Sequence, residues 1–131
     1  MIEIELFSDS SQNIKKYKIK GHANFASYGE DIVCSAVSVL SQTVIMGLVE
    51  ILELDENKIF YKIDENTGYL EVELKSIKNK ELLKETQILL KTFKIGIESI
   101  EENYPRNVNI EYRRCDWWLN WTYNYLLLKK G

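Results

Sequence analysis

The chain's single histidine, His22, lies twelve positions before Cys34, one of its two cysteines. A thiolate is a strong nucleophile and an imidazole is a natural base for a thiol, so this pair is sufficient for acyl transfer. The segment between them contains Gly29 and several small residues, which would allow a loop to bring the two side chains together. The competing interpretation is that Cys34 is a small buried hydrophobe and that His22 lies on the surface.

The predicted position of Cys34 at the start of a helix bears on whether its thiol is reactive. Asp31 is a typical N-cap residue, and it predicts a helix from there to about Leu54. Cys34 would then lie in the first turn, where free N–H groups and the helix dipole favour a thiolate. The N–H groups of Cys34 and Ser35 could also receive the negative oxygen of a tetrahedral intermediate. Asp31 itself would oppose a thiolate unless it caps the helix or orients the base, and Ser38 is more often bonded to a backbone carbonyl.

Composition excludes several other kinds of site. One histidine and two distant cysteines provide no metal-ligand spacing, so neither a metal nor another cofactor is expected. Cys115 lies beside Arg113 and Arg114, but no second histidine remains to serve it. A net charge of -3 lacks the basic excess of nucleic-acid-binding proteins. Without a signal-peptide pattern or a disulfide framework, we expect a cytoplasmic protein.

The elements that would position the pair follow from hydrophobic periodicity. Alternating apolar and polar residues predict five strands, at 1–7, 14–20, 58–63, 69–75 and 108–112. Two helices separate them, one from Asp31 and one from a cap at Asn79 to just before Pro105. The order ββαββαβ predicts an α+β fold, a mostly antiparallel sheet with two helices.

The uncharged run 32–49 is long enough to raise the question of a membrane span. Its serine, threonine and glutamine residues favour a buried helix instead, and no membrane contact is expected. Because the run has no polar face, we expect a second copy of the chain to cover part of it. Residues 1–112 are predicted to form one domain, and 113–131 an aromatic-rich C-terminal extension that packs on the domain or is dispensable.

Gly21-His22-Ala23, followed by the run GEDIVCSAVS at 29–38, resembles the composite motif of the ribosomal-processing cysteine protease family, Prp. The length and ββαββαβ order of residues 1–112 also resemble that family. The resemblance implies a homodimeric cysteine endopeptidase that removes the N-terminal extension of large-subunit ribosomal protein number twenty-seven. It implies a cut between an aromatic residue and alanine.

Carried over to this sequence, the resemblance implies that Cys34 is the nucleophile and His22 the general base, then the general acid. Gly21 would be the hinge of the loop, so alanine there should slow turnover with a modest effect on stability. Asp31 and Ser38 would support the site.

Two alternatives remain: a non-catalytic ribosome-assembly or binding module, and a thiol-dependent hydrolase or acyltransferase acting on small molecules.

Overall fold

The computed structural model describes residues 1–21 and 28–115, with the backbone alone at 28–31. Strands β1 and β2 form one hairpin, β3 and β4 a second, and β5 follows the second helix. The strands are β1 (Ile2–Ser8), β2 (Ile14–Lys20), β3 (Ile59–Asp64), β4 (Tyr69–Leu74) and β5 (Val108–Arg114). The helices are α1 (Tyr28–Met46), continued by the π-helical turn η1 (Gly47–Ile51), and α2 (Lys80–Asn103). The predicted ββαββαβ order and α+β class are confirmed.

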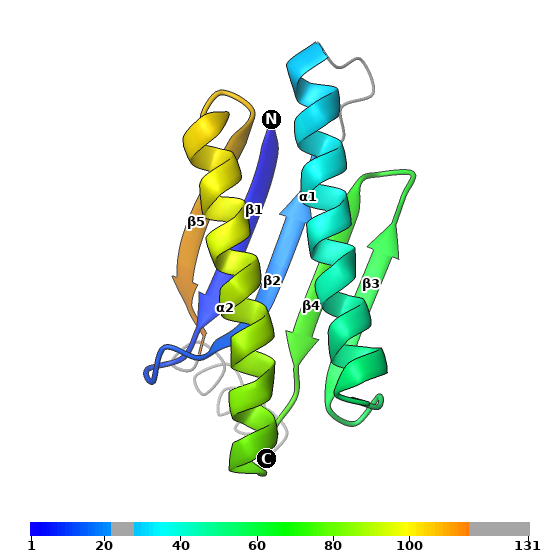
Figure 1. The fold of residues 1–131 in the computed structure, drawn as a ribbon, viewed down its shortest axis with the longest axis vertical. Helices are drawn as coiled ribbons and strands as arrows, with labels where there is room; N and C mark the ends of the chain where they lie inside the picture. Colours follow the sequence, from blue (N-terminus) through cyan, green and yellow to red (C-terminus); the bar gives the residue numbers. More distant parts are fainter. Residues whose placement is uncertain (22–27, 116–131) are drawn as a thin grey trace, which may run out of the picture.

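The five strands form one sheet in the order β3-β4-β2-β1-β5. All neighbours are antiparallel except β1 and β5, which run parallel with Ile2 opposite Val108. Ile19, near the end of β2, pairs with Leu70 at the start of β4. The end of β2, the β3–β4 turn and the start of β1 therefore meet at one end of the sheet (Figure 1).

Both helices cover the same face of the sheet, and the core lies between the two layers (Figure 1). Tyr17 of β2 is fully buried there, with its ring centroid 4.4 Å from that of Phe93 on α2. Its hydroxyl donates to the backbone oxygen of Ser41 on α1, at 2.9 Å. One side chain thus contacts the sheet's two covering helices. On the opposite face charged side chains pair across strands, as in the 3.1 Å contact between Lys16 Nζ and Glu71 Oε1.

Helix α2 begins where the sequence predicts, because Asn79 Oδ1 accepts a hydrogen bond from the N–H of Leu82 at 2.9 Å. About two turns after Asn79, the buried Gln87 holds the start of β2. Its Oε1 accepts from the N–H of Ile14 at 2.6 Å, and its Nε2 donates to the Ile14 oxygen at 2.9 Å. This pair of bonds replaces sheet hydrogen bonds next to the irregular register at the β1–β2 turn.

Helix α1 differs from its prediction at the N-terminus. It begins at Tyr28, so Asp31 lies inside the helix and the predicted N-cap is wrong. The stretch Ile32–Ile51 is long and apolar enough to cross a membrane by length and composition. In this fold Val33, Val37 and Leu48 of this stretch are buried in the hydrophobic core.

Candidate active site

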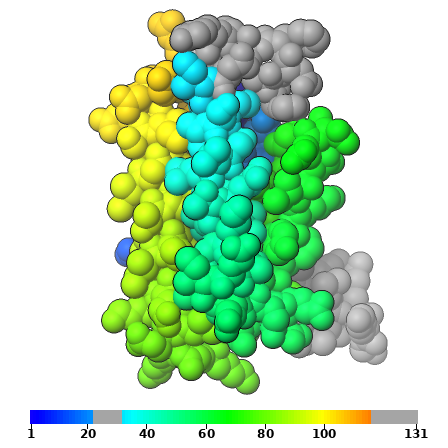
Figure 2. Space-filling view, turned by 45° about the vertical axis from the view of Figure 1, so that its right-hand side comes forward, coloured from blue at the N-terminus to red at the C-terminus, as the bar shows by residue number. Residues whose placement is uncertain are grey.

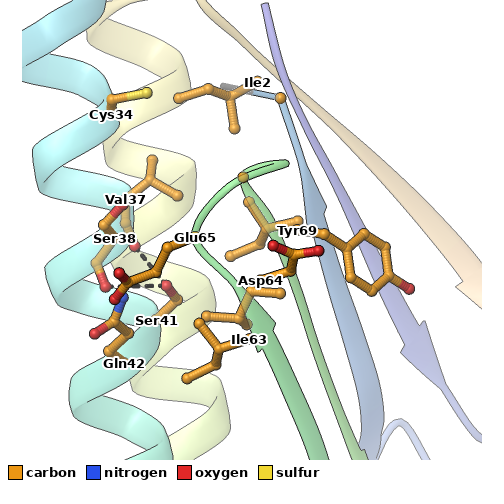
Figure 3. A pocket seen from close by; sticks show the side chains of 14 residues that line it. Ile2, Cys34, Val37, Ser38, Ser41, Gln42, Ile63, Asp64, Glu65 and Tyr69 are labelled. Carbon is orange, nitrogen blue, oxygen red and sulfur yellow. Dashed lines mark hydrogen bonds between the residues drawn. The ribbon is translucent and has the colours of Figure 1, made fainter. Parts of the chain in front are cut away.

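A cavity of about 240 Å³ opens between α1, the β3–β4 turn and the adjoining ends of β1 and β2 (Figures 2 and 3). In Figure 2 it is the hollow to one side of α1, with atoms of the N-terminal hairpin at its base. Its base is apolar, formed by Ile2, Ile19 and Leu70. The volume lies below the roughly 300–1,000 Å³ of sites for drug-sized ligands, so it suits a side chain of a longer ligand.

Cys34 stands at one end of this cavity. The thiol is half-buried, and in Figure 3 it points from α1 into the cavity on the side of Ile2. Because residues four apart share one face of a helix, Ser38 and Gln42 line the same cavity below Cys34. The structure therefore brings together Cys34, Ser38 and Gly21. Ser35 is exposed and does not line the cavity.

The early start of α1 changes the chemistry expected at Cys34. With the helix beginning at Tyr28, Cys34 lies in its second turn. The N–H groups of Cys34 and Ser35 are there engaged with carbonyls four residues earlier, and the free N–H groups belong to the first turn. The prediction that these two N–H groups form an oxyanion hole is therefore wrong. The predicted placement of the thiol at the helix terminus is wrong for the same reason.

Gly21 directly follows β2 at the rim of the cavity, and its backbone is tightly constrained. Its φ is +113°, a region that residues with a Cβ rarely adopt. A Cβ at this position would lie 2.5 Å from the backbone oxygen of Met1 and 3.0 Å from the Cα of Ile2. This close approach to the β1 backbone favours a larger loss of stability for alanine here than the modest effect expected from the sequence.

The β3–β4 turn supplies the wall that faces α1. Asp64 Oδ1 accepts from the N–H groups of Asn66 and Thr67, at 3.0 and 3.4 Å. Hydrogen bonds from Thr67 hold the pKa of Asp64 below its usual value, so this carboxylate stabilises the turn. Tyr69 directs its hydroxyl away from the cavity, to Glu71 Oε2 at 2.7 Å (Figure 3). Burial, then this bond, raises the pKa of Tyr69 to about 12.

Glu65, the next residue of the turn, lines the cavity and extends toward the Ser38 and Gln42 side of α1 (Figure 3). The sequence does not indicate this position, because residues 64–68, DENTG, are typical of a hairpin turn. The signal that could have found it is topological. A β4 strand antiparallel to β2 must place the β3–β4 turn at the same end of the sheet as Gly21.

Three expectations fall wholly or partly outside the described residues. His22 and the extension from residue 116 onward lie outside them, as does the side chain of Asp31. Within the part of the chain that is described, no group of three His, Cys, Asp or Glu side chains is placed to hold a metal ion.

Known proteins resemble this chain over most of its length. A family model described as cysteine protease Prp matches residues 1–109. The ribosomal processing cysteine protease Prp of Bacillus subtilis is 28% identical over 111 residues, which cover 84% of this chain and 96% of that protein. Its namesake from Staphylococcus aureus is 27% identical over 114 residues, covering 86% and 100% of the two chains.

Solved structures agree with the sequence relatives. SMU.848 from Streptococcus mutans is 29% identical and superposes with a TM-score of 0.76, over 88% of this chain and 96% of that one. The essential ribosomal processing protease Prp from S. aureus, in complex with a substrate peptide, superposes with a TM-score of 0.72. It is 20% identical, over 86% of this chain and all of that one, so it shows the likeness of the fold.

Proposed function

This chain belongs to the cysteine protease Prp family and is a cysteine protease, and from that premise we propose its substrate and its dyad. The substrate is the N-terminal extension of large-subunit ribosomal protein number twenty-seven, cut between an aromatic residue and alanine. Cys34 is the nucleophile, and His22 is the general base and acid. Such a reaction belongs in the cytoplasm, where ribosomes are assembled.

The observation that carries the proposal is the position of Cys34 on a cavity wall. The thiol is half-buried rather than enclosed in the core, and the cavity beside it is of side-chain size with an apolar base. A buried structural cysteine would have no such access. His22 directly follows Gly21 in the sequence, and Gly21 lines the same cavity as Cys34.

The chemistry proceeds in two steps. His22 removes the proton from the Cys34 thiol, and the sulfur attacks the carbonyl carbon of the scissile peptide bond. As the tetrahedral intermediate collapses, the C–N bond breaks and the proton passes from His22 to the leaving amine. Water, deprotonated by the same imidazole, then attacks the thioester and releases the acid and the free thiol. Ser38, one turn from Cys34, is proposed to contact the substrate, and Asp31 to support the histidine.

The test is cleavage of a peptide that spans the family's cleavage junction, followed by mass spectrometry. We expect one cut, between the aromatic residue and alanine. Cys34→Ser should lower the rate by about 10⁴-fold or more, because the nucleophile is lost. Cys115→Ser is the matched control. Cys115 is buried and donates its N–H to Ser8, at the end of β1 remote from Ile2 and the cavity.

Cys115→Ser should therefore cleave at the parent rate. Equal loss in both variants would mean that a general effect on folding, and not the nucleophile, explains the result. Binding of the peptide without any cleavage by the parent would favour the non-catalytic module.

His22→Ala separates the dyad from a lone reactive cysteine. Without an imidazole the leaving amine receives no proton, so we expect peptide turnover to fall by about 10²–10⁴-fold. Cys34 should still be alkylated by iodoacetamide, because the half-buried thiol remains accessible. Parent-level turnover in His22→Ala would remove this residue from the mechanism.

We also propose that the chain is a homodimer with α1 in its interface. Ile32, Val39 and Met46 recur every seven residues along α1 and are 43%, 67% and 53% exposed. Because residues seven apart share one face of a helix, they form an exposed apolar stripe along α1. Burial of such a stripe against a second copy is favourable because apolar area leaves water.

Val39→Glu is expected to convert the dimer to monomer in equilibrium sedimentation at micromolar protein. Ile95→Glu is the matched control, since Ile95 is equally exposed, at 69%, but lies on α2. A parent protein that sediments as a monomer would refute the dimer.

A further inference from the structure

The wall of the cavity that faces α1 holds an acidic group with no basic partner among the described residues. Of the described lining residues, only Asp64 and Glu65 carry charge, and both are acidic. Asp64 and Glu65 line the same cavity as Cys34, so a substrate side chain that enters the cavity would lie near them. The negative charge of this wall therefore affects which peptides bind. The roles of the two carboxylates differ, because only one of them already has hydrogen-bond partners.

The carboxylate of Asp64 is already committed to the turn. It accepts the N–H groups of Asn66 and Thr67. The positive charge of Lys62 also acts on it, from the side of the sheet opposite the helices. Asp64 is thus a structural residue, and its hydrogen bonds fix the backbone from which the next residue projects.

Glu65 is not committed in this way. Its side chain forms no hydrogen bond or ion pair with another described residue, and it reaches across the cavity toward α1 (Figure 3). The side chains of Ser38 and Gln42, on the facing wall of α1, also make no hydrogen bond with a described residue. A carboxylate, a hydroxyl and an amide oxygen on one cavity are acceptors for the several N–H donors of a lysine or arginine.

We propose that Glu65 selects substrates that carry a basic side chain close to the scissile bond, with Ser38 and Gln42 as further acceptors. This inference rests on the proposed cleavage at Cys34 and adds a specificity determinant to it. An ion pair at this partly open position gains modestly from Coulomb attraction, and it excludes an acidic side chain from the same place by repulsion.

The test uses a series of peptides that span the cleavage junction. Each peptide carries one lysine as its only charged side chain, and the lysine is placed in turn at each position around the scissile bond. Each lysine peptide has partners with glutamine or glutamate at the same position. At one position we expect the parent enzyme to show a kcat/KM about five-fold higher for lysine than for glutamine, as befits an exposed ion pair. That preference should shrink as salt concentration rises.

Glu65→Gln should bring the lysine-to-glutamine ratio at that position to about one, and Glu65→Lys should favour glutamate instead. Glu85→Gln is the control, because it removes one exposed glutamate from α2, away from the cavity, and should keep the parent's ratio. A lysine preference that persists in Glu65→Gln, or no preference at any position in the parent, overturns the inference.

The same peptides are also bound to Cys34→Ala protein and followed by fluorescence anisotropy, with and without Glu65→Gln. A lysine preference in binding that depends on Glu65 supports the inference even if the parent cleaves nothing, an outcome that refutes only the proposed cleavage. Cleavage by the parent without any dependence on Glu65 refutes only the inference. If the protein neither binds nor cleaves these peptides, the proposed cleavage and this inference are both refuted.

Discussion

Gly21→Ala tests the geometry at the rim of the cavity. The substitution adds one methyl group beside His22, at a residue whose φ is +113°. Backbone strain of this kind costs about 1–3 kcal/mol for a residue with a Cβ. The added Cβ would also lie 2.5 Å from the Met1 oxygen, so the first residues of β1 have to shift. We expect the free energy of unfolding to fall by about 2–4 kcal/mol, in the range of backbone effects at special φ values.

Thermal unfolding followed by circular dichroism measures this loss, and the expected fall in Tm is roughly 8–15 °C for a domain of this size. Gly68→Ala is the comparison, because Gly68 has a φ of +70° in the β3–β4 turn, near the left-handed region. Alanine there should cost only about 1–2 kcal/mol. If Gly21→Ala melts within about 2 °C of the parent, or loses less than Gly68→Ala, the close approach to Met1 does not constrain the fold.

Three further substitutions test the scaffold and its pH dependence. Gln87→Leu should cost about 2–4 kcal/mol in denaturant unfolding, because it leaves the buried N–H and oxygen of Ile14 without their partner. Tyr17→Phe should cost about 1 kcal/mol by the same assay, since it removes the bond to the Ser41 oxygen and keeps the ring. The pKa of Tyr69 is raised to about 12, so the folded state keeps a proton that the unfolded state loses near pH 10. Stability should therefore fall as pH rises from about 10 through 12, and Tyr69→Phe should weaken that fall in thermal melts.

Local patterns were sufficient to predict most of the elements. Alternation over 14–20 predicts β2 to the residue, and Asn79 marks the start of α2, because both signals act within a few residues. The start of α1 was missed for a physical reason. Asp31 carries the preferences of a cap, yet the helix continues upstream through Gly29, a residue that disfavours helix interiors. Helix propensity alone therefore does not explain that boundary.

The feature of the site that was not predicted from the sequence depends on contacts between residues far apart in the chain. The motif residues Gly21, Cys34 and Ser38 do gather on one cavity. The acidic wall at Glu65 arises from a turn more than twenty residues away in sequence, placed by the pairing of β2 with β4. The π-helical turn η1 at Gly47–Ile51 was not predicted either, although the bond from the Leu54 N–H to the Leu48 oxygen, at 3.1 Å, joins residues that are close in sequence.

The parallel pairing of β1 with β5 has a consequence for the order in which the protein folds. Because Ile2 of β1 pairs with Val108 of β5, one edge of β1 stays unpaired until β5 has been synthesised. At roughly 5–20 residues per second that interval lasts several seconds, during which β1 presents open backbone groups. Ile2 is also a wall of the cavity at Cys34. We therefore expect the cavity beside Cys34 to take its final shape only after β5 has been synthesised.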